Sequence, residues 1–175
     1  PRFNSVEFVI LFGSRKPESD LDICVILHDK IEVEDYYHSS MVDIIQYNKT
    51  DFLSRIKLFD LVATQPVITG DLIFGDEREF LKLRDYLFKN KPGDRAIKYL
   101  EQRSKECYNI ASSLLKNKED KKVILNGLSI LTYALSYEEF LTRYKNGSNI
   151  VLFSQINNDK INEIRKDIKR LESLF

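Results

Sequence analysis

Two apolar segments joined by a short polar connection constrain this fold most. Residues 6–12 and 21–27 are rich in apolar and β-branched side chains, and residues 21–27 alternate, which predicts two strands. A parallel crossover needs about a dozen residues or more. Only Gly13-Ser14 and the five residues 15–19 lie between the first strand and Asp20, so we expect the strands to be antiparallel. The end of the first strand then lies beside the start of the second.

Two carboxylates open the second strand. Successive side chains of a strand point to opposite faces, so Asp20 and Asp22 share a face. The neighbours of Asp22 are apolar on both faces, and a carboxylate left there without a partner would be costly. The pair therefore predicts a site for one Mg²⁺ or for two bridged ions. The alternative is that Asp20 caps a turn and Asp22 is solvated.

A third carboxylate follows the same pattern. Residues 41–47 form another apolar segment with Asp43 near its start. Residues 28–40 are long enough for a parallel crossover, so this strand can start beside Asp22. Asp43 could also be a strand-end charge that reaches water. In the first arrangement the three carboxylates meet Gly13-Ser14, whose backbone N–H groups can cradle a phosphate.

These segments resemble the nucleotidyltransferase superfamily, which has the fold of DNA polymerase beta and of the aminoglycoside and minimal nucleotidyltransferases. The matching pieces are residues 11–15 (LFGSR), 19–23 (SDLDI) and 42–45 (VDII), so the resemblance covers roughly the first half of the chain. It implies that Gly13 and Ser14 contact a nucleoside triphosphate, with charge from Arg15. It also implies that Asp20 and Asp22 bind two Mg²⁺ ions, and that Asp43 completes the metal site and activates the acceptor.

The expected activity is transfer of a nucleoside monophosphate from a triphosphate to an acceptor hydroxyl, with release of pyrophosphate. ATP and the other triphosphates stay open as donors, and a small molecule, a protein or an RNA end as acceptor. The connection after Gly13-Ser14 is shorter than is usual in the family, and Pro17 would stop a helix there. The alternative function is therefore a catalytically impaired nucleotide-binding protein or an antitoxin-like partner protein. A structural dimer is a third reading.

The rest of the chain predicts an α+β fold, a small mixed sheet followed by an antiparallel helical bundle. The best boundary is Lys91-Pro92-Gly93, which gives a nucleotidyltransferase domain at 1–91 and a helical domain at 94–175 for substrate binding or dimerisation. We expect a helix at 51–63 with Asp51 as its N-cap, two short strands within 66–76 around Gly70-Asp71, and a helix at 77–90. Apolar stripes predict three more helices, at 94–117, 119–145 and 158–175.

Composition narrows the setting of the protein. Residues 1–89 hold 16 Asp and Glu against 11 Lys and Arg, and residues 90–175 hold 11 against 16. This balance argues against a large nonspecific nucleic-acid footprint, although the basic half could help to hold an anionic substrate. No apolar run approaches the roughly 20 residues that span a bilayer. Cys24 and Cys107 suit reduced core positions, so we expect a cytoplasmic protein without membrane contact.

Overall fold

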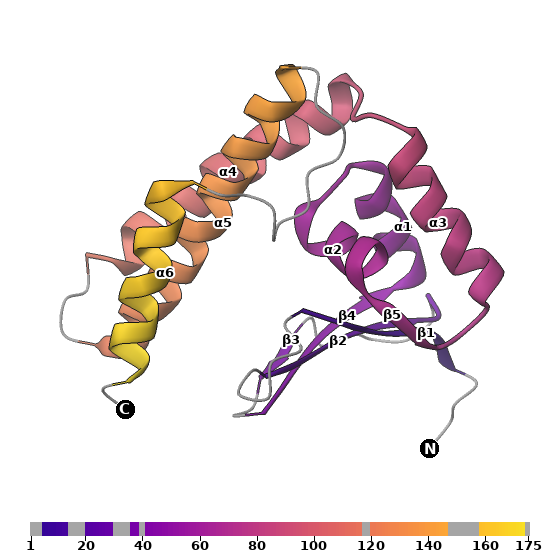
Figure 1. Cartoon of the computed structure of the whole chain (residues 1–175), viewed down its shortest axis with the longest axis horizontal. Helices are drawn as coiled ribbons and strands as arrows, with labels where there is room; N and C mark the ends of the chain where they lie inside the picture. Colours follow the sequence, from indigo (N-terminus) through magenta and orange to yellow (C-terminus); the bar gives the residue numbers. More distant parts are fainter. Residues whose placement is uncertain are drawn as a thin grey trace. The chain divides into compact units, whose positions relative to one another are not determined.

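The computed structural model of the chain describes residues 5–13, 20–29, 36–38, 41–116, 120–146 and 158–173. The chain divides into two compact units, residues 1–92 and residues 93–175. A mixed sheet with helices makes up the first unit, and the second is helical in the part that the structure describes (Figure 1). The α+β fold predicted from the sequence is confirmed.

The sheet has five strands among the described residues: β1 (Val6–Phe12), β2 (Leu21–Leu27), β3 (Tyr36–His38), β4 (Val42–Asn48) and β5 (Asp71–Phe74). Their order across the sheet is β3-β4-β2-β1-β5. Strand β2 is antiparallel to β1 and parallel to β4, so both pairings predicted from connection lengths are confirmed. The short strand β3 falls within residues 28–40, where the sequence indicated only a connection, and it pairs with β4.

Three helices of the first unit lie on one side of the sheet: α1 (Lys49–Lys57), α2 (Leu61–Thr69) and α3 (Glu77–Lys89) (Figure 1). Helix α1 packs on β2 and β4, and α2 packs on β1. Alternate strand residues are completely buried, among them Ile10, Cys24 and Ile26. Burying one such aliphatic side chain contributes about 1.5–3 kcal/mol, so this face anchors the strands that carry the candidate site.

The expected helix at 51–63 is wrong in its extent. Helix α1 begins three residues earlier than expected, with Asn48 instead of Asp51 as N-cap, and it ends at Lys57. Phe59 has a positive φ of 55°, and a new helix begins after Asp60, whose side chain accepts hydrogen bonds from the N–H groups of Val62 and Ala63. The buried cap at Asp60 therefore starts a second helix where the sequence predicted one continuous helix.

The strand expected at residues 66–69 is also wrong, because these residues form the last part of α2. The β-branched run Val67-Ile68-Thr69 favours a strand by local propensity. The Asp60 cap and the complete burial of Ala63 and Val67 outweigh that propensity, and Pro66 is tolerated inside the helix. Only the second expected strand exists, as β5, after α2 ends at Gly70.

The second unit packs helices α4 (Asp94–Leu114), α5 (Lys121–Lys145) and α6 (Asp159–Glu172). Helices α4 and α5 are antiparallel, since Glu101 pairs with Lys145 while Tyr108, further along α4, donates a hydrogen bond to Glu138, which lies earlier in α5. The core of this unit includes Leu100, Tyr137, Phe140 and Ile161. Among the described residues no helix is long and apolar enough to cross a membrane.

Candidate active site

Two of the three carboxylates stand side by side at the starts of neighbouring strands. Asp22 of β2 is in register with Asp43 of β4, and the register continues through Cys24 opposite Ile45. Residues in register on adjacent strands point to the same face, so both side chains emerge on the face that carries Cys24. Immediately before this pair, the N–H of Leu21 donates a hydrogen bond to the carbonyl oxygen of Met41, over 2.9 Å. This bond fixes the two strand starts to each other.

Asp20 completes the acidic group from the segment that leads into β2, and it is exposed. Its charge reaches Asp22, because the pKa of Asp22 is raised from its ordinary value of 3.8 to about 6, first by burial and then by the charges of Asp43 and Asp20. The charges of Asp43 and Asp20 therefore both act on Asp22. Three like charges near a half-buried position favour a bound cation, which would offset their repulsion.

Gly13 lies against the carboxylate of Asp22. It has a φ of 79°, a conformation that side-chain-bearing residues rarely adopt. A Cβ atom at this position would also overlap the Oδ2 and Cγ atoms of Asp22. The absence of a side chain at Gly13 thus permits the positive φ of the turn after β1 and also leaves room for the Asp22 carboxylate. Phe12, one residue earlier, is the partner of Asp22 in the antiparallel register.

The two other residues expected to bind nucleotide, Ser14 and Arg15, lie outside the described residues. Of the six site residues predicted from the sequence, the structure therefore describes four: Gly13 follows β1, Asp20 precedes β2, and Asp22 and Asp43 lie at the starts of β2 and β4. The remaining two follow Gly13 directly in the sequence.

The acidic residues suit Mg²⁺ by their chemistry. Within the part of the chain that the structure describes, no three His, Cys, Asp or Glu side chains are gathered as a ready metal site. Mg²⁺ does not require such a cage, because it is usually held by one or two carboxylates together with waters and substrate phosphates. Asp22 and Asp43 offer such a pair of hard oxygen ligands in register on two strands. The residues present fit a magnesium ion that binds together with a phosphate substrate.

Arg84, which joins two elements of the first unit, was not identified from the sequence. Arg84 of α3 donates hydrogen bonds from Nε to the carbonyl oxygen of Val67, over 2.7 Å, and from Nη2 to that of Gly70, over 2.6 Å. It therefore fastens α3 to the end of α2, where β5 begins. Nothing in its local sequence distinguishes Arg84 from the neighbouring exposed cations of the same helix, so only the fold could identify it.

The similarity that the comparisons with known proteins found is structural. No protein-family model matches the chain, and no curated protein matches it. Among solved structures, the chain is similar to a nucleotidyltransferase-like protein from Exiguobacterium sibiricum, with a TM-score of 0.46 and 15% sequence identity. The match covers 99% of this chain and 62% of that one, so this chain spans less than two thirds of the length of that protein. No activity follows from a similarity of this size.

Proposed function

We propose that the chain is a magnesium-dependent nucleotidyltransferase. The observation that carries the proposal is the pair Asp22 and Asp43, in register at the starts of two parallel strands, with the pKa of Asp22 raised first by burial and then by its carboxylate neighbours. Perturbed carboxylates clustered in this way are typical of functional sites, since folding alone gains nothing from placing them together. The sequence resemblance of residues 11–15, 19–23 and 42–45 to the nucleotidyltransferase superfamily adds to it.

The proposed reaction joins an acceptor hydroxyl to the α-phosphorus of a nucleoside triphosphate. A new bond forms between the hydroxyl oxygen and the α-phosphorus, and the bond from that phosphorus to the bridging oxygen breaks. Pyrophosphate leaves with the electron pair, and the hydroxyl proton passes to a carboxylate oxygen of Asp43. Mg²⁺, bound by Asp20, Asp22 and Asp43, would supply charge neutralisation for the phosphates.

The chain's own groups have two tasks in this proposal. The backbone N–H groups at Gly13 and Ser14 would hold the β- and γ-phosphates, while Arg15 adds positive charge. The carboxylates alone would repel a triphosphate, so we expect nucleotide binding to depend on the metal. The acceptor remains open among a small molecule, a protein hydroxyl and an RNA end, and a homodimer through the helical unit is part of the same proposal.

Calorimetric titration of the purified chain with each nucleoside triphosphate, with and without Mg²⁺, tests the proposal. We expect metal-dependent binding that Asp22→Asn abolishes, with a far-ultraviolet spectrum that stays native. Asp85→Asn is the matched control, because Asp85 is an exposed acid on α3 that pairs only with Lys89 in the described structure. Pyrophosphate release can then be measured with candidate acceptors.

Binding of no triphosphate would refute the proposal, and so would binding that Asp22→Asn leaves unchanged. Either result would move the search to a protein partner of a non-catalytic chain. Binding without turnover with any acceptor class would leave nucleotide recognition as the function.

A further inference from the structure

Strand β5 leaves an open edge in the first unit. It is the last strand in the order β3-β4-β2-β1-β5 and pairs only with β1 among the described residues. Its residues Ile73 and Phe74 are 62% and 45% exposed, and the strand contains neither Lys nor Pro. Proteins usually protect an open edge by charge, proline or a covering segment, since its backbone groups can pair with another chain. In β5 the charge is confined to the first residue, Asp71, and an edge that ends in exposed apolar residues indicates an interaction site.

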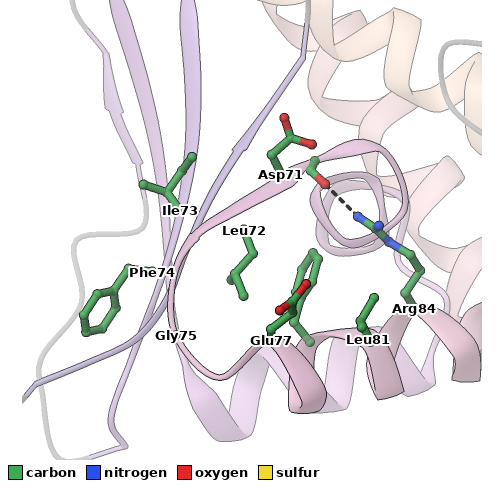
Figure 2. Close-up of a pocket in the computed structure, with 10 residues that line it drawn as sticks. Asp71, Leu72, Ile73, Phe74, Gly75, Glu77, Leu81 and Arg84 are labelled. Carbon is green, nitrogen blue, oxygen red and sulfur yellow. Dashed lines mark hydrogen bonds between the residues drawn. The ribbon is translucent and has the colours of Figure 1, made fainter.

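A cavity of about 490 Å³ runs along this edge (Figure 2). Its lining comes from residues 70–75 and from helix α3 alone, so it lies on the side of β5 away from β1. Leu72 forms one wall, and Leu81, which is 46% exposed, forms the opposite wall. We call this space the β5–α3 slot. Its volume is in the range of sites that bind ligands of several residues or rings, about 300–1,000 Å³.

The helical wall of the slot is firmly held. Arg84 donates to the carbonyl oxygens of Val67 and Gly70, and its guanidinium lies 4.9 Å from the centre of the Phe80 ring. Phe80 is buried and packs against the ring of Phe8 in β1. The dashed line from Arg84 in Figure 2 is this hydrogen bond to the carbonyl oxygen of Gly70. The slot is therefore a fixed feature between two anchored elements.

We propose that the β5–α3 slot binds an extended peptide segment of a partner protein. The segment would add a strand to the outer edge of β5 and place apolar side chains against Leu72 and Leu81. Strand β5 has four residues, which span about 13 Å at roughly 3.3 Å per residue. The slot thus fits a core of about four or five peptide residues.

The charge around the slot defines the partner further. Asp71 and Glu77 line it, and Asp76 stands exposed immediately before α3, whereas Glu79 lies outside the lining and pairs with Lys82. Arg84, the cation in the lining, already binds two carbonyl oxygens. An acidic rim attracts a segment that carries Lys or Arg beside its apolar residues. A second copy would bring the same acidic turn in a symmetric pairing, and nucleic acid would bring phosphates, so both are disfavoured.

Selection from a phage-displayed library of random ten-residue peptides, with the full purified chain as bait, tests the proposal. We expect enriched peptides to alternate apolar residues and to carry Lys or Arg at one end. The best peptide, made with a fluorescent label, is then titrated by anisotropy. Hydrogen exchange of the complex should show new protection at the amides of Leu72–Phe74.

Matched variants assign the binding to the slot. Leu81→Arg should weaken peptide binding at least about tenfold, because it places a cation in an apolar wall. Phe88→Arg is its control, since Phe88 is 55% exposed on the same helix and does not line the slot. Glu77→Lys should also weaken peptide binding. Glu79→Lys is its control and should leave binding unchanged, because Glu79 is on the same helix but does not line the slot. All four positions are exposed, and a thermal melt of each variant checks that it stays folded.

Three results would overturn the proposal: no enriched peptide, protection that falls outside residues 70–75, or equal effects of Leu81→Arg and Phe88→Arg. Concentration-dependent dimerisation that protects the same strand would replace the peptide by a second copy. The peptide assay contains neither nucleotide nor metal, so a negative result would not bear on the proposed nucleotidyltransferase activity. A chain without that activity could still bind a peptide in the β5–α3 slot.

Discussion

Replacement of Asp22 by asparagine should stabilise the metal-free protein at neutral pH. The reason is that burial in the folded chain, together with the charges of Asp43 and Asp20, raises the pKa of Asp22 from 3.8 to about 6. Asparagine has nearly the same shape and no charge. The variant therefore removes the cost of ionising this carboxylate inside the fold while it leaves the packing of β2 in place.

The sign follows from proton binding. Below pH 4 the group is protonated in both the folded and unfolded states, so its charge adds no cost to folding. Between pH 4 and pH 6 the unfolded chain gives up its proton first, so the stability of the native protein falls as the pH rises. Above pH 6 the full cost is present. The advantage of Asp22→Asn should accordingly be absent near pH 4 and complete above pH 6.

The magnitude follows from the two pKa values. The difference between 3.8 and about 6 corresponds to about 3 kcal/mol, at 1.36 kcal/mol for each pH unit. Asp22 is only partly buried, so water screens part of the repulsion, and we expect about 1–2 kcal/mol. Even this reduced value is a large share of the stability of a small domain, which is about 5–15 kcal/mol.

Urea unfolding in the presence of a chelator, at a series of pH values from 4 to 8, measures the effect. Asp85→Asn is the control, because Asp85 is exposed and should show no such gain at high pH. A stability difference that is independent of pH, or that grows as the pH falls, would refute the reasoning from the clustered carboxylates. A destabilised Asp22→Asn at pH 8 would do the same.

Three further predictions test the surroundings of the site. Mg²⁺ should raise the melting temperature of the unmodified chain and leave that of Asp22→Asn unchanged; at 100 times the dissociation constant the expected stabilisation is about 2.7 kcal/mol. Gly13→Ala should destabilise the fold by about 1–3 kcal/mol in urea, because its φ is positive and its Cβ would meet Asp22, and an added Asp22→Ala should recover part of the loss. Arg84→Met should cost about 2–4 kcal/mol through two lost charge-assisted hydrogen bonds, whereas Arg78→Met, on the exposed side of α3, should change urea stability by less than about 0.5 kcal/mol.

Connection lengths were enough to predict how the site strands pair. Residues 13–20 are too few for a crossover and residues 28–40 are enough for one, so β1 and β2 had to be antiparallel while β2 and β4 could be parallel. Period-two alternation also predicts that Asp20 and Asp22 share a face, although Asp20 precedes β2 in the structure. These rules depend on chain geometry and on nothing distant, which is why they succeed from sequence alone.

The failures occurred where a distant contact outweighs local preference. Val67-Ile68-Thr69 has the composition of a strand, yet the cap at Asp60 and the buried surface of α2 make it helical. The hydrogen bonds of Arg84 join residues 14 and 17 positions apart in the chain. The contact between Gly13 and Asp22 likewise depends on the register of two strands. Each of these depends on burial, strand register or a contact between elements, which local preference does not specify.

Two unfavourable features of the candidate site, the half-buried carboxylate of Asp22 and the glycine at position 13, are physically linked. A carboxylate at Asp22 raises the free energy of the folded state, and Gly13 gives up the side chain that would stiffen the turn at the end of β1. The glycine at position 13 makes room for the carboxylate at position 22, since the Asp22 carboxylate lies where a Cβ atom of residue 13 would be. Packing alone would favour an apolar residue at position 22, because such a residue carries no charge that must be buried. The proposed binding of a metal by the carboxylate would account for both. The double variant Gly13→Ala/Asp22→Ala separates the two contributions: its unfolding free energy should exceed that of Gly13→Ala alone, and metal and nucleotide binding should be lost.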